Sequence, residues 1–261
     1  MQVKLLARDV RGWHERQCSR PLVLLSEGHY DDSLTEWVQR LALYEFADAL
    51  PTSPECRAEL MFSEPRAVEW PDMALDTADA EESLRMSLGK RLGLGLQAAM
   101  PAIHRAQADG SVPAMWWTEV PPEQDADSAQ HGLDALLQLL AGWPDLTPRT
   151  MLVLSIHLVT GEVGGAAPLR EAFVSRLDAA VGQGRVQAVK LGRLPLITAS
   201  DLTFWADDDR VRPHLPASVQ SLRERLGSQP LPMWPFVKQF NQWVDAHAPG
   251  RPGDPSRGSI R

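Results

Sequence analysis

The amino-acid sequence predicts an α/β fold: a mostly parallel β-sheet flanked by helices, followed by a small helical C-terminal portion. The first observation is that short runs of consecutive apolar residues, typical of strands buried on both faces, recur along the chain. The second is that stretches with apolar residues at helical spacing separate these runs. The third is that only helical patterns remain after residue 197.

The composition is that of a soluble globular protein. The chain has 261 residues, of which 44% are hydrophobic and 23% charged, enough to bury a sizeable core. Its 26 basic and 34 acidic residues give a net charge of −8, and such a surface repels phosphate backbones. No apolar run approaches the roughly 18 residues that span a bilayer, and the first twenty residues lack a secretory signal. We therefore expect a cytoplasmic protein that binds neither nucleic acid nor membranes.

The α/β domain is predicted to begin with a strand, a turn and a helix. The apolar run at 21–25 is the strand, and the polar turn after it extends from Ser26 to Ser33. Beyond the turn, apolar residues between 34 and 42 recur at helical spacing, with Ser33 and Glu36 placed as a capping box.

Alternating strands and helices follow up to residue 197. We predict strands at 67–70, 114–120, 151–159, 186–189 and 194–197, and helices near 84–105, 133–140 and 169–181. Asp79 and Glu82 form a second capping box before the first of these helices, which continues toward Arg105 despite its glycines. An acidic loop at 121–128 precedes the helix that ends at Gly142.

The C-terminal portion is predicted to be helical. Residues Thr198 to Asp201 cap a short helix, and two more helices follow near 217–226 and 233–247. The tail, rich in Pro, Gly, Ser and Arg, should be disordered. The predicted organisation is an N-terminal extension (1–20), the α/β domain (21–197), the helical portion (198–247) and the tail (248–261).

The turn after the first strand is the default ligand site of a parallel α/β domain, because the next helix presents its N-terminus there. Nucleotide hydrolases carry the phosphate-binding (P-loop) pattern G-x-x-x-x-G-K-[ST] in this turn. Laid on residues 26–33, the pattern puts Ser26 and Asp31 at its glycines and Asp32 at its lysine, and only Ser33 matches. Carboxylates here repel phosphates and are also explained by capping of the next helix. The positions of this degenerate P-loop (Walker A) are Ser26, Gly28, His29, Asp31, Asp32 and Ser33.

No other pattern predicts catalysis or a metal site. The strand at 151–159 runs into Ser155 and His157 without the acid that would organise magnesium, and Glu119 after the preceding strand is a weak match. The histidines show neither H-x-x-x-H nor H-E-x-x-H spacing, and Cys18 and Cys56 have no peptidase signature. We therefore expect no catalytic, cofactor-binding or metal-binding residues, no cofactor and no enzyme activity.

Aromatic residues gather in the C-terminal portion. Three of them recur at helical spacing and form a stripe that either packs on the core or, where exposed, offers a surface to a protein partner. The candidate partner surface comprises Trp205, Trp234, Phe236, Phe240 and Trp243.

Several motifs, taken in order, resemble the inactive STAND family, relatives of the STAND signalling NTPases that lack the nucleotide-hydrolysis motifs. They are the opening strand with residues 27–33, Glu69-Trp70-Pro71, the strand that contains Thr118, the Gly-Trp-Pro-Asp-Leu segment at 142–146, and residues 196–205. The resemblance spans roughly residues 20–246 and implies a P-loop NTPase-like fold. It also implies a scaffold of bacterial conflict and signalling systems, found beside adaptor domains and caspase-like or trypsin-like peptidases. No adaptor domain is evident before residue 21, so the partner is expected in trans.

We therefore expect a non-enzymatic adaptor or regulatory module of bacterial antiviral signalling that acts through protein partners. A peptidase or other effector of the same system is one expected partner, with the loop at 121–128 as an exposed cleavage site. Two alternatives remain open. One is a nucleotide sensor that binds without hydrolysing, with Arg149 or Arg193 in place of the lysine. The other is a metal-assisted hydrolase that uses His29, Asp31 and Asp32.

Overall fold

The computed structural model describes residues 9–13, 15, 19–29, 65–71, 76–108, 114–147, 151–160, 167–193, 196–206, 219–227 and 229–247. The chain divides into two compact units. The described residues up to 193 form an α/β unit, and those from 196 onward form a helical unit. The helix predicted at 34–42 and the tail from residue 248 lie outside the described residues.

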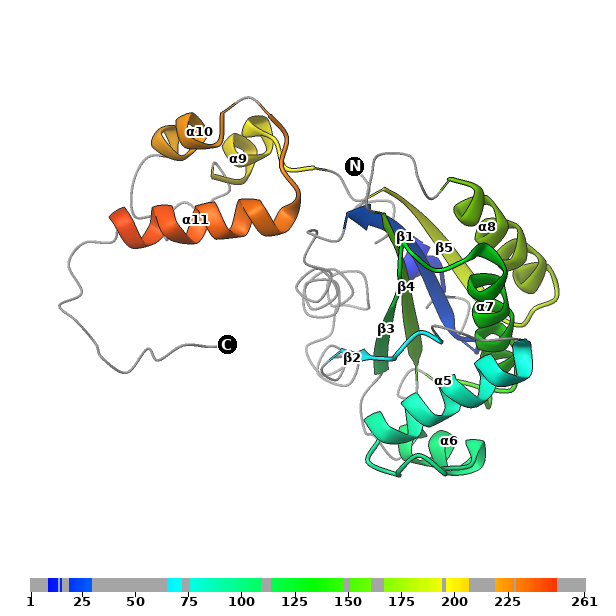
Figure 1. The fold of residues 1–261 in the computed structure, drawn as a ribbon. Helices are drawn as coiled ribbons and strands as arrows, with labels where there is room; N and C mark the ends of the chain where they lie inside the picture. The colour runs from blue at the N-terminus through cyan, green and yellow to red at the C-terminus, as the bar shows by residue number, and fades with distance from the viewer. Residues whose placement is uncertain are drawn as a thin grey trace. The chain divides into compact units, whose positions relative to one another are not determined.

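The first unit is built on a five-stranded parallel sheet (Figure 1). Its strands are β1 (Leu22–His29), β2 (Arg66–Ala67), β3 (Ala114–Val120), β4 (Leu152–Thr160) and β5 (Gln187–Arg193). They lie in the order β2-β3-β4-β1-β5, and each pair of neighbours is parallel. The prediction of an α/β fold with a mostly parallel sheet is confirmed. β1, the first of these strands in sequence, lies between β4 and β5.

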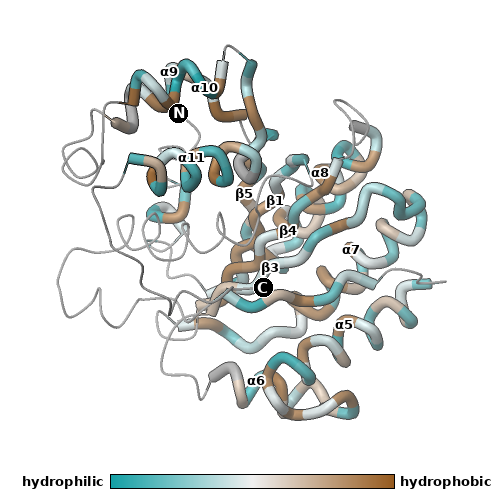
Figure 2. Tube along the Cα trace, turned by 60° about the vertical axis from the view of Figure 1, so that its left-hand side comes forward, coloured by the Kyte–Doolittle hydropathy of each residue, from teal (hydrophilic) through white to brown (hydrophobic). Residues whose placement is uncertain are grey.

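Helices cover one face of this sheet, with α5, α7 and α8 forming a layer beside it (Figure 1). The helices of the unit are α5 (Thr77–Arg91), α6 (Met100–Ala108), α7 (Ala126–Ala141) and α8 (Ala167–Gly182). Side chains alternate between the two faces of a strand, so Val23 and Leu25 of β1 point to the same face. The core joins them to one buried side chain from each helix of the layer: Leu84, Leu133 and Phe173. In Figure 2 these helices carry both brown apolar and teal polar segments, as expected of helices with one buried side.

The helix predicted to continue toward Arg105 is in fact two helices. α5 begins after the N-cap Asp76 rather than at a capping box containing Asp79. It stops before Gly93 and Gly95, whose φ angles of 71° and 83° lie in the left-handed region that favours glycine. The glycines therefore end α5 and turn the chain toward α6.

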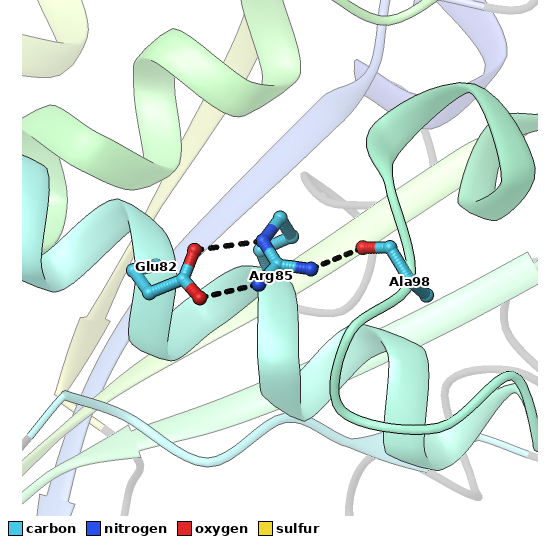
Figure 3. A network of polar contacts seen from close by, with 3 residues as sticks. All are labelled: Glu82, Arg85 and Ala98. Carbon is cyan, nitrogen blue, oxygen red and sulfur yellow. Dashed lines mark hydrogen bonds and ion pairs between the residues drawn. The ribbon is translucent and has the colours of Figure 1, made fainter.

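The segment after α5 folds back onto that helix. Arg85 forms an ion pair with Glu82 and donates a hydrogen bond to the carbonyl of Ala98 (Figure 3). Gly89 of α5 faces the same segment, and a Cβ built on it would lie 2.5 Å from the carbonyl oxygen of Gly95. The close approach therefore requires a residue without a side chain at position 89.

α7 begins inside the predicted acidic loop. Asp125 is its N-cap, and the carboxylate accepts hydrogen bonds from two amides of the first turn at 3.1 and 2.9 Å. Gly142 is its C-cap, at the predicted end of the helix. The loop is therefore shorter than predicted, and the side-chain amide of Gln124 ties it to the carbonyl of Pro71 at 2.7 Å.

A helical segment at 9–13 belongs to the same unit. Val10 and Trp13 are buried, and Trp13 Nε1 donates a hydrogen bond to the Arg20 carbonyl at 3.1 Å. A cavity beside Trp13 is lined by residues at the amino-terminal ends of β1 and β5, among them Leu22 and Val189. The predicted N-terminal extension thus supplies packed residues to the α/β unit.

The second unit contains α9 (Ala199–Ala206), α10 (Gln220–Leu226) and α11 (Met233–His247). Its buried core is made by one side chain from each helix: Leu202, Leu222 and Trp243. The predicted capping box before α9 is confirmed. The Asp201 amide donates to Thr198 Oγ1 at 3.2 Å, and the Thr198 amide donates to Asp201 Oδ2 at 2.8 Å.

The strand predicted at 194–197 is not part of the sheet. β5 continues through the break between the two predicted strands and ends at Arg193. Ile197 instead forms an isolated antiparallel bridge with Leu231, and both residues belong to the second unit.

Candidate functional site at the carboxyl edge of the sheet

The candidate site is the edge of the sheet at which the parallel strands end. β2, which follows β1 in sequence, lies at one side of the sheet. β5, which follows β4 in sequence, lies at the other side, beyond β1. Ligands of open parallel sheets bind outside the carboxyl ends of the strands at such a reversal. The end of β1 supplies Glu27 and His29 here, while β3 supplies Glu119 and β4 supplies His157. The cavity beside Trp13 lies at the opposite end of the strands and is lined by both polar and apolar residues.

β1 runs straight through the region where the sequence predicts a turn. Its pairing with β4 continues without a register shift from Leu22 to His29, which lies opposite Thr160. The Thr160 hydroxyl donates a hydrogen bond to the carbonyl of Gly28 at 3.0 Å. Ser26, Glu27, Gly28 and His29 are therefore strand residues, and the predicted turn is wrong at these four positions. The remaining positions of the degenerate P-loop, 31–33, lie outside the described residues.

Ser26 and His157 form a buried polar pair on the sheet face opposite the helices. Ser26 Oγ lies 2.9 Å from His157 Nδ1 and 3.4 Å from the carbonyl oxygen of Ile156. The side chains of Ser26 and His157 are each 1% exposed. Both contacts are hydrogen bonds when Nδ1–H donates to the serine oxygen and the serine hydroxyl donates to the carbonyl. In that tautomer His157 Nε2 carries a free lone pair.

Two buried polar atoms, one in this pair and one next to it, have no hydrogen-bond partner among the described residues. They are His157 Nε2 and Ser155 Oγ, which lie two residues apart on β4 and so on the same face. Burial lowers the pKa of His157 to about 4, so the imidazole is neutral at neutral pH. A buried polar atom without a partner is uncommon in native proteins and points to a water, an ion or a functional role.

Glu119 completes a row of three polar side chains on adjacent strands. Glu119 of β3 lies opposite His157 of β4, which lies opposite Ser26 of β1. Paired residues of parallel strands share a face, so the three side chains rise from the same side of the sheet. Glu119 reaches solvent, yet desolvation by its surroundings raises the pKa of its carboxyl. Sequence reasoning noted His157 and Glu119 separately, but their alignment depends on strand order.

An ion pair lies on the helix-covered face at the same edge. Glu27 Oε2 is 3.6 Å from Nε of Arg170, in the first turn of α8. Sequence reasoning missed Arg170, because nothing in its local pattern links it to β1. Arg193 lies opposite Glu27 in the ladder between β1 and β5, and Arg149 lies outside the described residues. The buried hydroxyl of Thr118, on this face too, has no partner among the described residues.

The three described members of the predicted aromatic surface pack in or against the core of the second unit. Trp243 is 1% exposed, and its Nε1 donates a hydrogen bond to Ser221 Oγ at 2.8 Å. Phe236 and Phe240 are half-buried, with ring centroids 6.0 Å apart, and pack against the same core. Trp243 is therefore unavailable to a partner in this conformation. The side chains of the other two members, Trp205 and Trp234, lie outside what the structure describes.

The described part of the chain contains neither a metal-binding cluster of three or more side chains nor a membrane-spanning helix. Within it, no group of three or more His, Cys, Asp or Glu side chains is arranged to hold a metal ion. None of its helices combines the length and the apolar character needed to cross a membrane. Both cysteines, Cys18 and Cys56, lie outside the described residues.

The chain has no match among protein-family models and none among curated proteins. Among solved structures it is similar to the ADP form of the Aeropyrum pernix ORC2 protein. That similarity has 13% identity and a TM-score of 0.45, over 87% of this chain and 52% of that one. A second ORC2 structure, of ADPNP–ADP complexes, is 10% identical with a TM-score of 0.44, over 92% of this chain and 66% of that one. The chain thus spans between about half and two thirds of the length of these two chains, and neither match assigns it to a family.

Proposed function

We propose that this chain is a non-enzymatic adaptor or regulatory module that acts through protein partners and does not hydrolyse nucleotides. One observation carries the proposal: β1 stays paired with β4 as far as His29. In a phosphate-binding loop the main chain leaves the strand and turns its amides toward the phosphates. Here the residues that would begin the loop, from Ser26 onward, are fixed in the sheet instead.

The charges at the carboxyl edge also disfavour phosphate. Glu27 and Glu119 are acidic, the guanidinium of Arg170 is paired with Glu27, and Arg193 lies opposite Glu27 in the ladder between β1 and β5. A phosphate-binding site needs cations or free amides at this place. The described part of the edge therefore supports a site that has lost phosphate binding, in keeping with the acidic net charge of −8.

The resemblance to the inactive STAND family supports a setting in bacterial antiviral or conflict signalling, in the cytoplasm. We propose that the partner is met in trans and is a peptidase or other effector of the same system. The loop at 121–128 is a poor cleavage site, because α7 begins at Ala126 and Gln124 anchors the remainder. If a peptidase cleaves this chain, another exposed segment must be its target.

The first test is nucleotide binding, measured as the melting temperature of the full chain with and without millimolar ATP, ADP or GTP and magnesium. A ligand at 100 times its Kd adds about 2.7 kcal/mol to the stability, which a melting curve resolves easily. We expect no shift. A shift in the wild type would overturn the proposal in favour of a nucleotide sensor, and phosphate release would establish a hydrolase.

A variant distinguishes the two features that are expected to prevent nucleotide binding: the continued pairing of β1 with β4 and the negative charge at the carboxyl edge. Glu27→Gln removes the partner of Arg170 and one negative charge from the edge. If the straight course of β1 prevents binding, this variant also shows no shift. A shift confined to Glu27→Gln would show that charge alone excludes the nucleotide.

The second test is partner binding. The full chain is mixed with a caspase-like or a trypsin-like peptidase of a bacterial conflict system, and complex formation is measured by size-exclusion chromatography with light scattering. We expect a stoichiometric complex that forms equally well with and without nucleotide. A complex that requires ATP, or nucleotide turnover that appears only with the partner, would contradict the proposal.

A further inference from the structure

His157 has the arrangement of a metal-ligating histidine. Metal-bound imidazoles usually donate their other ring N–H to a fixed acceptor, which sets the tautomer and the ring orientation. Nδ1 of His157 lies 2.9 Å from Ser26 Oγ, and that hydroxyl lies 3.4 Å from the carbonyl of Ile156. In the tautomer in which Nδ1–H donates to Ser26, Nε2 carries a lone pair that is buried and has no partner among the described residues.

A carboxylate lies on the strand next to this imidazole. β4 lies between β1 and β3, so an imidazole whose Nδ1 contacts β1 directs Nε2 away from β1. Glu119 of β3 is in register with His157 and on the same face. The Glu119 side chain is exposed to solvent.

We propose that His157 Nε2 and the Glu119 carboxylate bind a divalent transition-metal ion of the Zn²⁺ class on the sheet face opposite the helices. One imidazole nitrogen and one carboxylate oxygen are ligands that suit zinc and its neighbours, whereas magnesium and calcium prefer oxygen alone. A bound cation satisfies the nitrogen that lacks a partner and balances the charge of the Glu119 carboxylate. The proposal does not rest on the proposed function.

The site supplies fewer protein ligands than a closed structural zinc site, which has four. Water, or a side chain brought by a partner, fills the remaining positions. Ser26 is a positioning residue here, because it fixes the ring without touching the ion. Removal of such an outer-shell partner typically weakens metal binding by about 10–100-fold.

The test is a titration of the tag-free full chain, stripped with chelator, with Co²⁺ followed by visible absorption and then with Zn²⁺ in competition. The two ligand variants are His157→Asn and Glu119→Gln. Asparagine keeps an N–H near the place of Nδ1, so its contact with Ser26 is preserved while Nε2 is lost. His247→Asn is the matched control, because His247 is an exposed histidine of the second unit.

We expect the wild type and His247→Asn to bind one ion saturably, and both ligand variants to lose this binding. Ser26→Ala should bind about 10–100-fold more weakly, while Ser26→Thr, which keeps the hydroxyl, should recover most of the affinity. Absence of saturable binding at millimolar Co²⁺ would overturn the proposal. Undiminished binding by His157→Asn would do the same, and if that variant fails to fold, undiminished binding by Glu119→Gln decides against it.

Discussion

Gly89, near the end of α5, offers a sharp test of the packing described above. An alanine Cβ there would lie 2.5 Å from the Gly95 carbonyl oxygen and 3.0 Å from the Cβ of Ala98. The segment that carries these atoms is held close to α5, because Arg85 of α5 donates a hydrogen bond to the Ala98 carbonyl. Alanine gains about 1 kcal/mol over glycine in a helix interior, whereas overpacking costs about 1–3 kcal/mol. With a backbone oxygen as the obstacle we expect the upper part of that cost, and a net loss of about 1–2 kcal/mol.

The assay is urea unfolding of the wild type, Gly89→Ala and a matched control, Gly182→Ala. Gly182 is the last residue of α8, and a Cβ built on it meets nothing within 4 Å. The control should be as stable as the wild type or slightly more stable, through helix propensity alone. Gly89→Ala should show a lower midpoint at an unchanged m-value. If Gly89→Ala is at least as stable as the wild type, the close approach of this segment to α5 is wrong.

Three further predictions concern stability. Asp125→Ala removes the N-cap of α7 and should lower the free energy of unfolding by about 1 kcal/mol in urea titrations, whereas Asp127→Ala should cost less. Trp243→Ala empties the core of the second unit and should cost about 3–5 kcal/mol. Hydrogen exchange of α10 and α11 checks this, and unchanged protection would contradict it. Because burial lowers the pKa of His157 from 6.5 to about 4, the unfolded chain takes up its proton first as the pH falls. Stability should therefore be intact above about pH 6.5 and drop by about 3 kcal/mol toward pH 4. Urea unfolding in the presence of chelator measures the drop, and His157→Asn should lack this component.

Apolar patterning predicted the interior of the sheet well. β3 lies at the predicted residues, and β4 differs by one residue at each end, since both are runs of apolar residues with little alternative to burial. α11 also matches its predicted span, because its apolar residues keep helical spacing throughout. In these elements each residue's local preference agrees with its place in the fold.

The polar end of β1 was predicted wrongly for a physical reason. Ser26, Gly28 and His29 have the composition of a turn, and nothing local distinguishes them from one. Their strand conformation is stabilised by partners on β4, and the Ser26 partner, His157, lies 131 residues away. The row of Glu119, His157 and Ser26 cannot be predicted from local patterns either, because it depends on the order of the strands in the sheet.

Glycine spacing misled the prediction in a different way. Gly89, Gly93 and Gly95 lie within seven residues of one another and were all treated as weak points of one helix. Gly89 is helical, and its lack of a side chain allows another part of the chain to approach, whereas Gly93 and Gly95 adopt positive φ and end the helix. The same residue type therefore serves two purposes, and only tertiary contacts separate them.

The central position of β1 has a consequence for the order of folding. The strand leaves the ribosome before the other strands of the sheet, yet its two neighbours, β4 and β5, are the last strands to be made. Pairing across so many residues carries a large loop-closure entropy and slows folding. Throughout synthesis the apolar run at 22–25 has no native neighbour, so the nascent chain exposes an aggregation-prone segment until β4 and β5 emerge. Slow translation of the stretch between β1 and β4 should therefore lower the yield of native protein.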